Sequence, residues 1–168
     1  ILIAFTCVTY NQQSHFNSYS EPEGLCHPFV YTINQDLNGY IWIGTGEGLC
    51  RFDGFSFTSG TEIDSLPIEI VNVSFKDSFG NIWFGYNNGA LFSYDGIYFS
   101  KHSIDKEANL SITGIAQSSK DNNILVATQK NGIYVVDGDN QVKSFEHDFS
   151  DILITTILAK DEFLFIGS

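Results

Sequence analysis

Positive charge is scarce in this 168-residue sequence. It holds 8 Lys and Arg residues against 20 Asp and Glu residues, a net charge of −12. Proteins that bind nucleic acids use Lys and Arg to release counterions from phosphates, so this balance excludes a nucleic-acid partner. An anionic membrane surface is disfavoured for the same reason. A neutral ligand such as a sugar, or a cationic ligand, remains compatible, and so does the alternative that the acidity only keeps the protein soluble.

Cysteine is also scarce, and no stretch is long and apolar enough to cross a membrane. The three cysteines, Cys7, Cys26 and Cys50, include no Cys-x-x-Cys pair, so they indicate neither a zinc site nor a redox motif. We expect Cys26 and Cys50 to be small buried residues rather than disulfide partners.

Motifs of catalysis and cofactor binding are missing as well. The four histidines show no metal-ligand spacing, and the sequence has neither a phosphate loop nor a Gly-x-Ser-x-Gly nucleophile elbow. We therefore expect no cofactor, no metal and no enzymatic activity in this segment.

Methionine is absent, and the sequence opens on the short apolar run 1–8, followed by polar residues 11–14. This pattern is typical of the end of a secretory signal, with a buried N-terminal strand or a lipoprotein signal ending at Cys7 as alternatives. We expect residues 1–14 to be the remnant of a secretory signal and leader, and the natural start to lie upstream.

Strand-forming residues are abundant. Phe and Tyr number 15 and 8, 43% of residues are hydrophobic, and 15 glycines stand between the apolar segments. Aromatic and β-branched residues separated by Asn-Gly and Asp-Gly turns are typical of short antiparallel strands.

A repeat of 41 residues links Asp36 to Asp77 and Trp42 to Trp83, and it continues more weakly to Leu125 and Phe165. The positions that register it are Asp36, Gly39, Trp42, Gly44, Asp53 and Gly54 in the first copy, Asp77, Gly80, Trp83, Gly85, Asp95 and Gly96 in the second, and Asp137 and Gly138 in the third. A β-rich period of this length is typical of propeller blades.

The predicted fold is therefore all-β: a partial β-propeller of four-stranded antiparallel blades, with about three complete blades and the start of a fourth. We expect an N-terminal strand at 15–23 that would close the ring in the intact protein, then blades at 24–65, 66–108 and 109–150 and a truncated blade at 151–168. In the first blade, strands are expected over 29–35, 40–45, 49–52 and 55–58, with a loop over 59–67.

The repeated Asp and Trp each allow two interpretations. Alternating Asp and Asn at Asp36 and Asp77 suggest a calcium loop, but further ligands and the closing Glu are missing, which favours a carboxylate that caps the turn. Trp42 and Trp83 are expected to pack between blades, with ligand stacking as the alternative.

A propeller binds ligands at one mouth of its channel, where the turns between second and third strands meet the loops that follow the fourth strands. The polar residues predicted to approach a ligand there are Glu47, Asn87, Asn88, Lys130 and Asn131. The alternative is that they are ordinary turn residues.

The first copy, with Ile41-Trp-Ile-Gly-Thr45, Gly48-Leu49 and Phe52-Asp-Gly54, resembles the two-component regulator propeller repeat. The second copy departs at Tyr86, which replaces Thr, and by one extra residue before Asp95; the third lacks the Trp and its Gly. Many members of that family carry two seven-bladed propellers outside the inner membrane, ahead of a small β-sandwich, a membrane helix and a histidine kinase.

The resemblance implies an extracytoplasmic, periplasmic ligand-sensing segment of a two-component sensor, carbohydrate-responsive and anchored in the inner membrane through its parent chain. Its implied partners are an oligosaccharide or other small ligand, the remaining blades and signalling domains of the parent, and a second copy in a homodimer. A propeller scaffold of a cell-surface or secretion accessory protein, and a propeller enzyme such as a lyase or glycosidase, are the alternatives.

Overall fold

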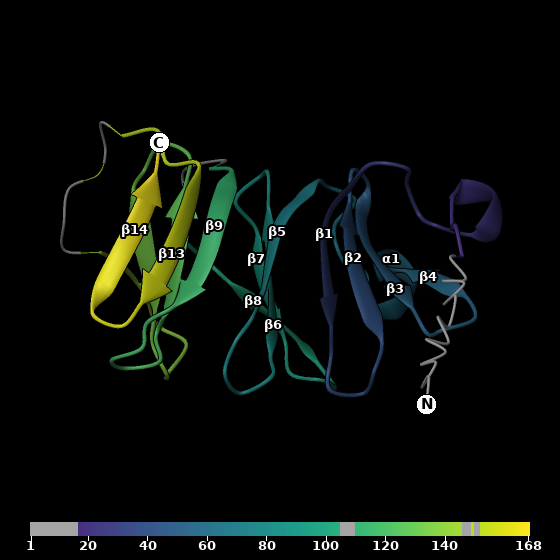
Figure 1. The fold of residues 1–168 in the computed structure, drawn as a ribbon, viewed down its shortest axis with the longest axis horizontal. Coiled ribbons are helices and arrows are strands. Elements are labelled where there is room, and N and C mark those ends of the chain that lie inside the picture. The colour runs from purple at the N-terminus through teal and green to yellow at the C-terminus, as the bar shows by residue number, and fades with distance from the viewer. Residues whose placement is uncertain (1–16, 105–109, 146–148, 150–151) are drawn as a thin grey trace, which may run out of the picture.

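The computed structural model describes residues 17–104, 110–145, 149 and 152–168. These residues form fourteen strands in four antiparallel sheets. The sheets stand side by side, and the strand axes of neighbouring sheets are roughly aligned (Figure 1). The predicted all-β partial propeller is confirmed.

Three sheets are complete four-stranded meanders, and a fourth has two strands. Blade 1 contains β1 (Val30–Gln35), β2 (Ile41–Thr45), β3 (Gly48–Phe52) and β4 (Phe57–Ser59). Blade 2 contains β5 (Val71–Lys76), β6 (Ile82–Tyr86), β7 (Leu91–Tyr94) and β8 (Phe99–His102). Blade 3 contains β9 (Ile112–Gln117), β10 (Ile124–Thr128), β11 (Ile133–Val136) and β12 (Val142–Ser144), and the fourth sheet contains β13 (Thr156–Lys160) and β14 (Phe163–Gly167).

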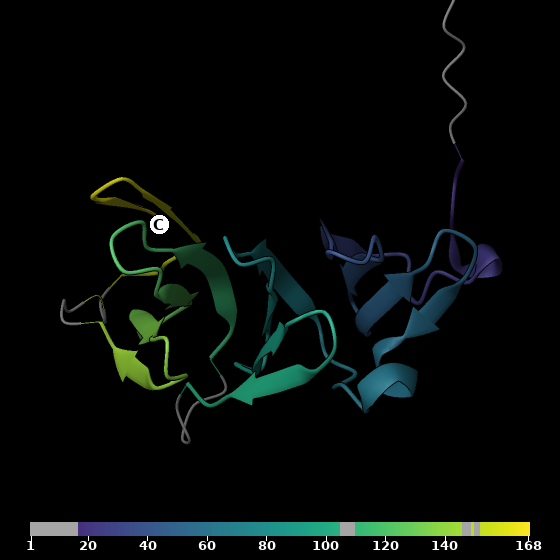
Figure 2. The ribbon, with the colours of Figure 1, turned by 90° about the horizontal axis from the view of Figure 1, so that it is seen from below.

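The first strand of each sheet lies on the inside of the array. Strand β1 contacts β5, β5 contacts β9, and β9 contacts β13, so the four inner strands lie next to one another. Seen from below, the sheets spread from these inner strands like an open fan (Figure 2). Each blade therefore buries one face on its neighbour, as a propeller requires.

The repeated glycines Gly44 and Gly85 let the blades approach closely. A Cβ at Gly44 would lie 2.9 Å from Val71, on the inner strand of blade 2, and a Cβ at Gly85 would lie 2.5 Å from Ile112, on that of blade 3. Real Cβ atoms do not approach other atoms so closely, so the motif glycine marks the contact between inner strands.

The repeated Asp joins the turn to the Trp. The Asp36 carboxylate accepts hydrogen bonds from the backbone N–H groups of Asn38 (2.9 Å) and Tyr40 (3.0 Å), and from the Trp42 indole N–H (2.9 Å). Asp77 accepts the same three kinds of bond in blade 2, including one from the Trp83 indole at 2.9 Å. The prediction of a turn-capping carboxylate is confirmed, and the bond to the indole is an addition that sequence spacing did not suggest.

The two Trp residues pack between blades, as predicted. The ring of Trp42 lies 6.0 Å from Phe84, 5.0 Å from Tyr94 and 5.3 Å from Phe99, all in blade 2. Trp83 belongs to a buried cluster with blade 3 residues such as Ile124. Both indoles are buried, so they contribute to the joints between blades rather than to a surface that a ligand can reach.

The prediction that Cys26 and Cys50 are unpaired is wrong. The two form a disulfide with Cα atoms 5.8 Å apart. The chain before β1 runs across the face of blade 1 that points away from blade 2, which brings Cys26 onto β3. A separation of 24 residues between two cysteines does not by itself predict that they lie close together in space.

The predicted strand over 15–23 is wrong in its second half. Residues 21–23 form a short 3-10 helix, η1 (Glu21–Glu23), and residues 17–20 pair with no strand. Tyr19 packs on blade 1 instead, with its ring 5.0 Å from Phe52 and 5.6 Å from Phe57. Residues 1–14 and the start of the predicted strand lie outside the described residues, and its ring-closing role stays a prediction.

The predicted loop over 59–67 holds a short helix, α1 (Gly60–Asp64). The chain leaves it through Ser65, which has φ +49°, and Leu66 is then buried between blades 1 and 2. Neither η1 nor α1 is long enough to span a bilayer, and the described residues include no other helix.

Candidate functional site

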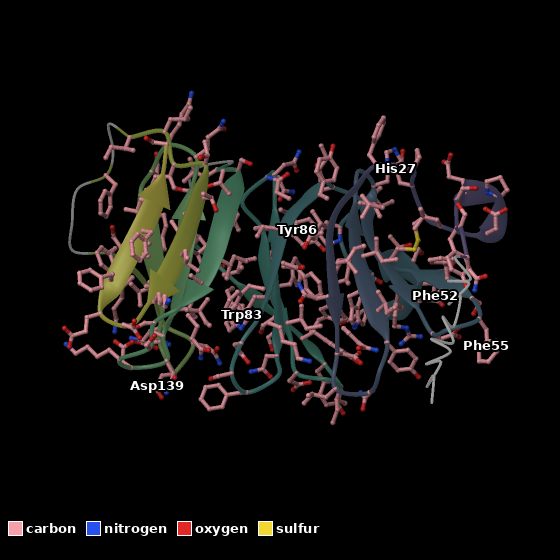
Figure 3. The ribbon with its side chains drawn as sticks, viewed as in Figure 1. His27, Phe52, Phe55, Trp83, Tyr86 and Asp139 are labelled. Atoms are coloured by element: carbon pink, nitrogen blue, oxygen red, sulfur yellow. A yellow bond between two sulfur atoms is a disulfide. The ribbon has the colours of Figure 1, made fainter. Side chains whose placement is uncertain are left out.

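The turns between second and third strands lie at one end of the blades, where the sequence places the ligand-facing residues. Figure 3 shows Tyr86 and His27 toward this end, and Trp83, Phe55 and Asp139 toward the other. We call the end that carries Tyr86 and His27 the upper face and the opposite end the lower face.

One position in each upper turn lies beside the inner strand. The backbone N–H groups of Gly46, Asn87 and Gln129 donate to the carbonyl groups of Phe29, Ile70 and Ser111, at 3.0, 2.9 and 2.9 Å, and each acceptor directly precedes its inner strand. Among the predicted site residues, Asn87 alone occupies this position. Gln129 is its counterpart in blade 3, and the sequence prediction missed it.

The other predicted residues sit further out in the turns. The N–H of Glu47 donates to Thr45 Oγ1 and that of Asn131 to Thr128 Oγ1, both at 3.2 Å, and Asn88 Oδ1 accepts from the N–H of Ala90 at 3.0 Å. Three of the predicted residues therefore take part in turn geometry. The side chains of Glu47 and Asn131 remain exposed, as does that of Lys130.

Blade 2 departs from its neighbours at the residue before Asn87. Thr45 and Thr128 donate their hydroxyls to the carbonyls of Gly48 (2.8 Å) and Gly132 (3.0 Å), closing the turns of blades 1 and 3. Tyr86 takes their place, is fully buried, and finds no partner for its hydroxyl among the described residues. Burial raises the pKa of this hydroxyl well above its usual range, so it stays protonated.

Asn87 also has an unpaired buried atom. Its Oδ1 is covered from solvent and accepts no hydrogen bond from the described residues. A buried acceptor of this kind commonly binds an ordered water or a ligand, because leaving it unpaired costs about 1–3 kcal/mol. The chemistry that completes it is a hydrogen-bond donor such as a hydroxyl group.

A groove of about 340 Å³ opens beside Glu47. It lies between the segment before β1 and the loop after β4, and Glu47, Thr61 and Glu62 give it a polar wall facing apolar Leu49 and Ile68. The groove falls within the volume range of small-molecule sites. Its two carboxylates suit a neutral polyol or a cation and repel an anion.

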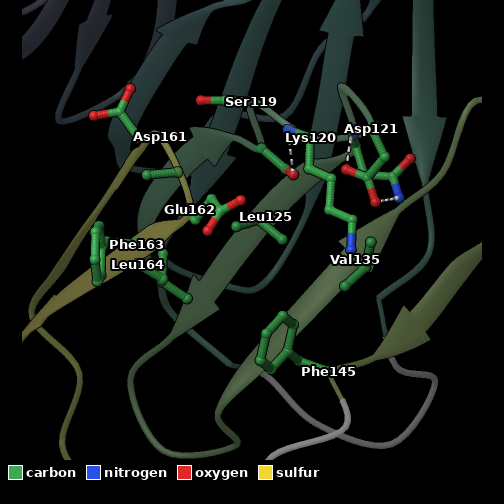
Figure 4. Close-up of a pocket in the computed structure, with 13 residues that line it drawn as sticks. Ser119, Lys120, Asp121, Leu125, Val135, Phe145, Asp161, Glu162, Phe163 and Leu164 are labelled. Atoms are coloured by element: carbon green, nitrogen blue, oxygen red, sulfur yellow. Dashed lines mark hydrogen bonds between the residues drawn. The ribbon is translucent and has the colours of Figure 1, made fainter.

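A larger cavity of about 650 Å³ lies between blade 3 and the fourth sheet (Figure 4). Its floor includes Leu125, at the position of the Trp residues, together with Val135 and Phe145. At the joint of blades 1 and 2 the same surface is covered by Tyr94 and Phe99, which come from the third and fourth strands of blade 2. We therefore assign this cavity to packing between blades rather than to a ligand.

The residues that the structure describes contain no group of three His, Cys, Asp or Glu side chains able to hold a metal ion. The hydrogen bonds of Asp36 and Asp77 also argue against the calcium interpretation. Each carboxylate already accepts at least three hydrogen bonds from N–H groups of its own blade, which occupies the oxygen atoms that calcium would need.

No family model matches the chain. Over 60 residues, 34% of this chain and 4% of the other protein, it is 37% identical to Histidine kinase P4 of Formosa agariphila.

Among solved structures, it is similar to the extracellular domain of BT4673 of B. thetaiotaomicron, described as a one component system, with a TM-score of 0.72 and 24% identity, covering 94% of this chain and 23% of that one. It is also similar to the extracellular domain of BT3049 of the same organism, described as a hybrid two component system, with a TM-score of 0.66 and 26% identity, covering 92% of this chain and 21% of that one.

A streptogramin B lyase matches with a TM-score of 0.65 and 18% identity, covering 86% of this chain and 50% of that one. This likeness shows the propeller fold alone. The likeness to two-component sensors that the repeat motifs indicated is confirmed by the kinase and by the extracellular domains, and the predicted extracytoplasmic location agrees with the latter. The chain spans less than a quarter of those domains and a small part of the kinase.

Proposed function

We propose that the chain is an extracytoplasmic ligand-sensing propeller segment of a two-component sensor, anchored in the inner membrane and signalling to a histidine kinase elsewhere in the parent protein. The observation that carries the proposal is the combined match of one sequence to a histidine kinase and to extracellular domains of two-component systems. The Cys26–Cys50 disulfide supports the location, because disulfides persist in oxidising compartments such as the bacterial periplasm.

The ligand we propose is a neutral oligosaccharide at the upper face. The net charge of −12 and the carboxylates of Glu47 and Glu62 repel anions, while the free acceptor at Asn87 calls for a hydroxyl or other donor. Lys130 and Asn131 are exposed in the neighbouring turn of blade 3 and extend this polar surface.

Calorimetric titration with neutral oligosaccharides of xylose, glucose and mannose tests the ligand class, with a sulfated oligosaccharide as the anionic comparison. Binding of a neutral oligosaccharide should weaken by about fivefold or more in Glu47→Ala and Asn87→Ala, because each removes a polar contact of about 1 kcal/mol. Asp139→Ala, on the lower face, is the matched control and should bind normally. Preference for the sulfated sugar would contradict the ligand class.

The sensor assignment has a separate test. The coding sequence downstream of this segment should encode a membrane helix followed by a histidine-kinase domain. A stop codon soon after the propeller would overturn the sensor and favour the scaffold alternative, whatever the sugar titrations show.

A further inference from the structure

Three turns on the lower face of blades 1 and 2 carry large apolar side chains that face solvent. Leu37, Phe79, Ile97 and Tyr98 are exposed by 68%, 67%, 73% and 71%. We call these four residues the tip patch. Single exposed apolar residues are normal on protein surfaces, but a contiguous group of this size commonly marks an interaction site.

The tip patch is contiguous because its turns touch. The Leu37 side chain lies against Gly80, where a Cβ would stand 2.6 Å from Leu37 Cδ1, so Leu37 meets the turn that carries Phe79. The Asn38 side chain donates to the Gly96 carbonyl at 3.1 Å, which joins the Leu37 turn to the turn of Ile97 and Tyr98.

Hydrogen bonds hold these tips in place. The Asp77 carboxylate accepts from the N–H of Phe79 at 2.9 Å, and the Asp95 carboxylate accepts from the N–H groups of Ile97 and Tyr98, both at 2.8 Å. A surface whose backbone is already fixed loses little conformational entropy on binding, which favours recognition.

The repeat does not require apolar tips. In blade 3 the position of Phe79 is held by Lys120, and the positions of Ile97 and Tyr98 are held by Asp139 and Asn140, with the same Asp-Gly pair before them. Because the blade 3 turns form with polar residues, the apolar tips of blades 1 and 2 serve something other than the fold of the turn.

The area of the patch indicates the size of its partner. A covered aromatic side chain buries about 150–250 Å², so four large side chains that are about two-thirds exposed offer on the order of 500 Å². A stable dimer of two globular chains needs about 800 Å² from each partner. The tip patch therefore suits a short segment better than a second copy of this chain.

Charge indicates the chemistry of that partner. The backbone N–H groups of Tyr98 and Ile97 hold the pKa of Asp95 below its usual range, and those of Ser56 and Phe55 do the same for Asp53 in the adjoining blade. Both groups are therefore ionised at neutral pH beside an apolar centre, in a chain of net charge −12. Two cations lie near these turns, and both already have partners: the Lys76 ammonium group donates to the Gln35 carbonyl, and the Arg51 guanidinium lies 4.5 Å from the centre of the Tyr40 ring.

We propose that the tip patch is a docking surface for a short apolar segment of a partner protein, flanked by Lys or Arg. A peptide of alternating leucine and lysine, fluorescently labelled, serves as the probe in anisotropy titrations with the whole chain. A matched peptide of leucine and glutamate tests the charge requirement. The double variant Phe79→Ser, Ile97→Ser should weaken binding of the lysine peptide by about tenfold or more, as expected when contacts at an interface centre are lost.

The control is Phe55→Ser. Phe55 is 96% exposed on the turn of blade 1 that corresponds to Ile97, but no described contact ties it to the tip patch. This variant should bind the lysine peptide as the parent chain does, and all three proteins should show the same circular dichroism. Affinity should also fall as NaCl rises from about 50 to about 300 mM, since the flanking charges are exposed and screened.

Equal binding of the two peptides, or an unchanged affinity in the double variant, would overturn the proposal. Sedimentation velocity and vesicle pelleting test two other possible occupants of the tip patch, a second copy of this chain and a membrane. A dimer of the parent chain that the double variant loses would assign the patch to self-association instead. Pelleting with phosphatidylcholine vesicles that depends on Phe79 and Ile97 would assign it to a membrane.

Discussion

Blade 2 and blade 3 have the same four-stranded plan but join the next sheet in different ways. In blade 2, Asp77 caps its turn and bonds the Trp83 indole, and the indole fills the joint. In blade 3, Ser118 stands at the start of a turn that is one residue longer, and Leu125 replaces the Trp. The turn carboxylate and the indole are absent together, so the repeat motif describes a joint between blades and not two separate features.

The largest expected effect on stability comes from removing a Trp side chain that fills a joint between blades. Trp83→Ala should lower the free energy of unfolding by about 3–5 kcal/mol, because it removes a buried aromatic side chain and leaves a cavity. Leu125→Ala should cost about 2 kcal/mol, the low end for such a change, because Leu125 already borders a large cavity. Urea unfolding followed by circular dichroism measures both, and equal losses would contradict the distinction between the joints.

On the face of blade 1 that points away from blade 2, a disulfide bond joins the segment before β1 to strand β3. Replacing Cys26 and Cys50 by Ser should lower the free energy of unfolding by about 2–4 kcal/mol, since the disulfide restricts the unfolded chain. Dithiothreitol should destabilise the parent chain by a similar amount and leave the double variant unchanged. A parent chain that is insensitive to the reductant would show that the bond contributes little.

These contacts show where sequence reasoning reached its limit. The Asp-Gly turns and the Trp spacing predicted the strands, because turn chemistry and apolar periodicity act over a few residues. The Cys26–Cys50 bond was missed because it depends on how the chain before β1 lies across a sheet. The α1 helix was missed because Leu66 gains its burial only when blades 1 and 2 are assembled.

The candidate site was predictable only as a face. Strand order places all upper turns at one end, so the region of Glu47, Asn87 and Lys130 followed from the sequence. Which of these side chains is left with a free polar atom did not follow, since it depends on the packing of Asn87 against its surroundings. Gln129 was missed because its relation to Asn87 rests on a backbone hydrogen bond to the residue before the inner strand.

Substitution of the turn aspartate Asp77 tests how much the hydrogen bonds of the turn contribute to the difference in stability between the blade 2 and blade 3 joints. Asp77→Asn should lower the free energy of unfolding by about 1–3 kcal/mol, because the neutral amide weakens charge-assisted bonds to two backbone N–H groups and the Trp83 indole. Ser118→Ala, at the corresponding place in blade 3, should cost about 1 kcal/mol or less. A larger loss in Ser118→Ala would show that blade 3 depends on its turn as much as blade 2 does.

The smallest expected effect is a dependence on pH that blade 2 shows and blade 3 lacks. His102 is 5% exposed, its ring lies 4.8 Å from that of Trp83, and its Nε2 lies 2.8 Å from Ser93 Oγ. Phe145 takes the corresponding place in blade 3 and cannot titrate. Burial lowers the pKa of His102 from its ordinary value of 6.5, so the folded state holds the neutral ring.

The sign of the effect follows from the bound proton. Below about pH 6.5 the unfolded chain binds a proton at His102 more readily than the folded chain does, so the stability present above this pH is lost as the pH falls. Urea unfolding at about pH 7.5 and about pH 5.5 should therefore show a smaller pH effect in His102→Phe, the residue type of blade 3, than in the parent chain. His27→Gln controls for a partly exposed histidine outside the joint. An identical pH effect in the parent and in His102→Phe would mean that the stability of the blade 2 joint does not depend on protonation of His102.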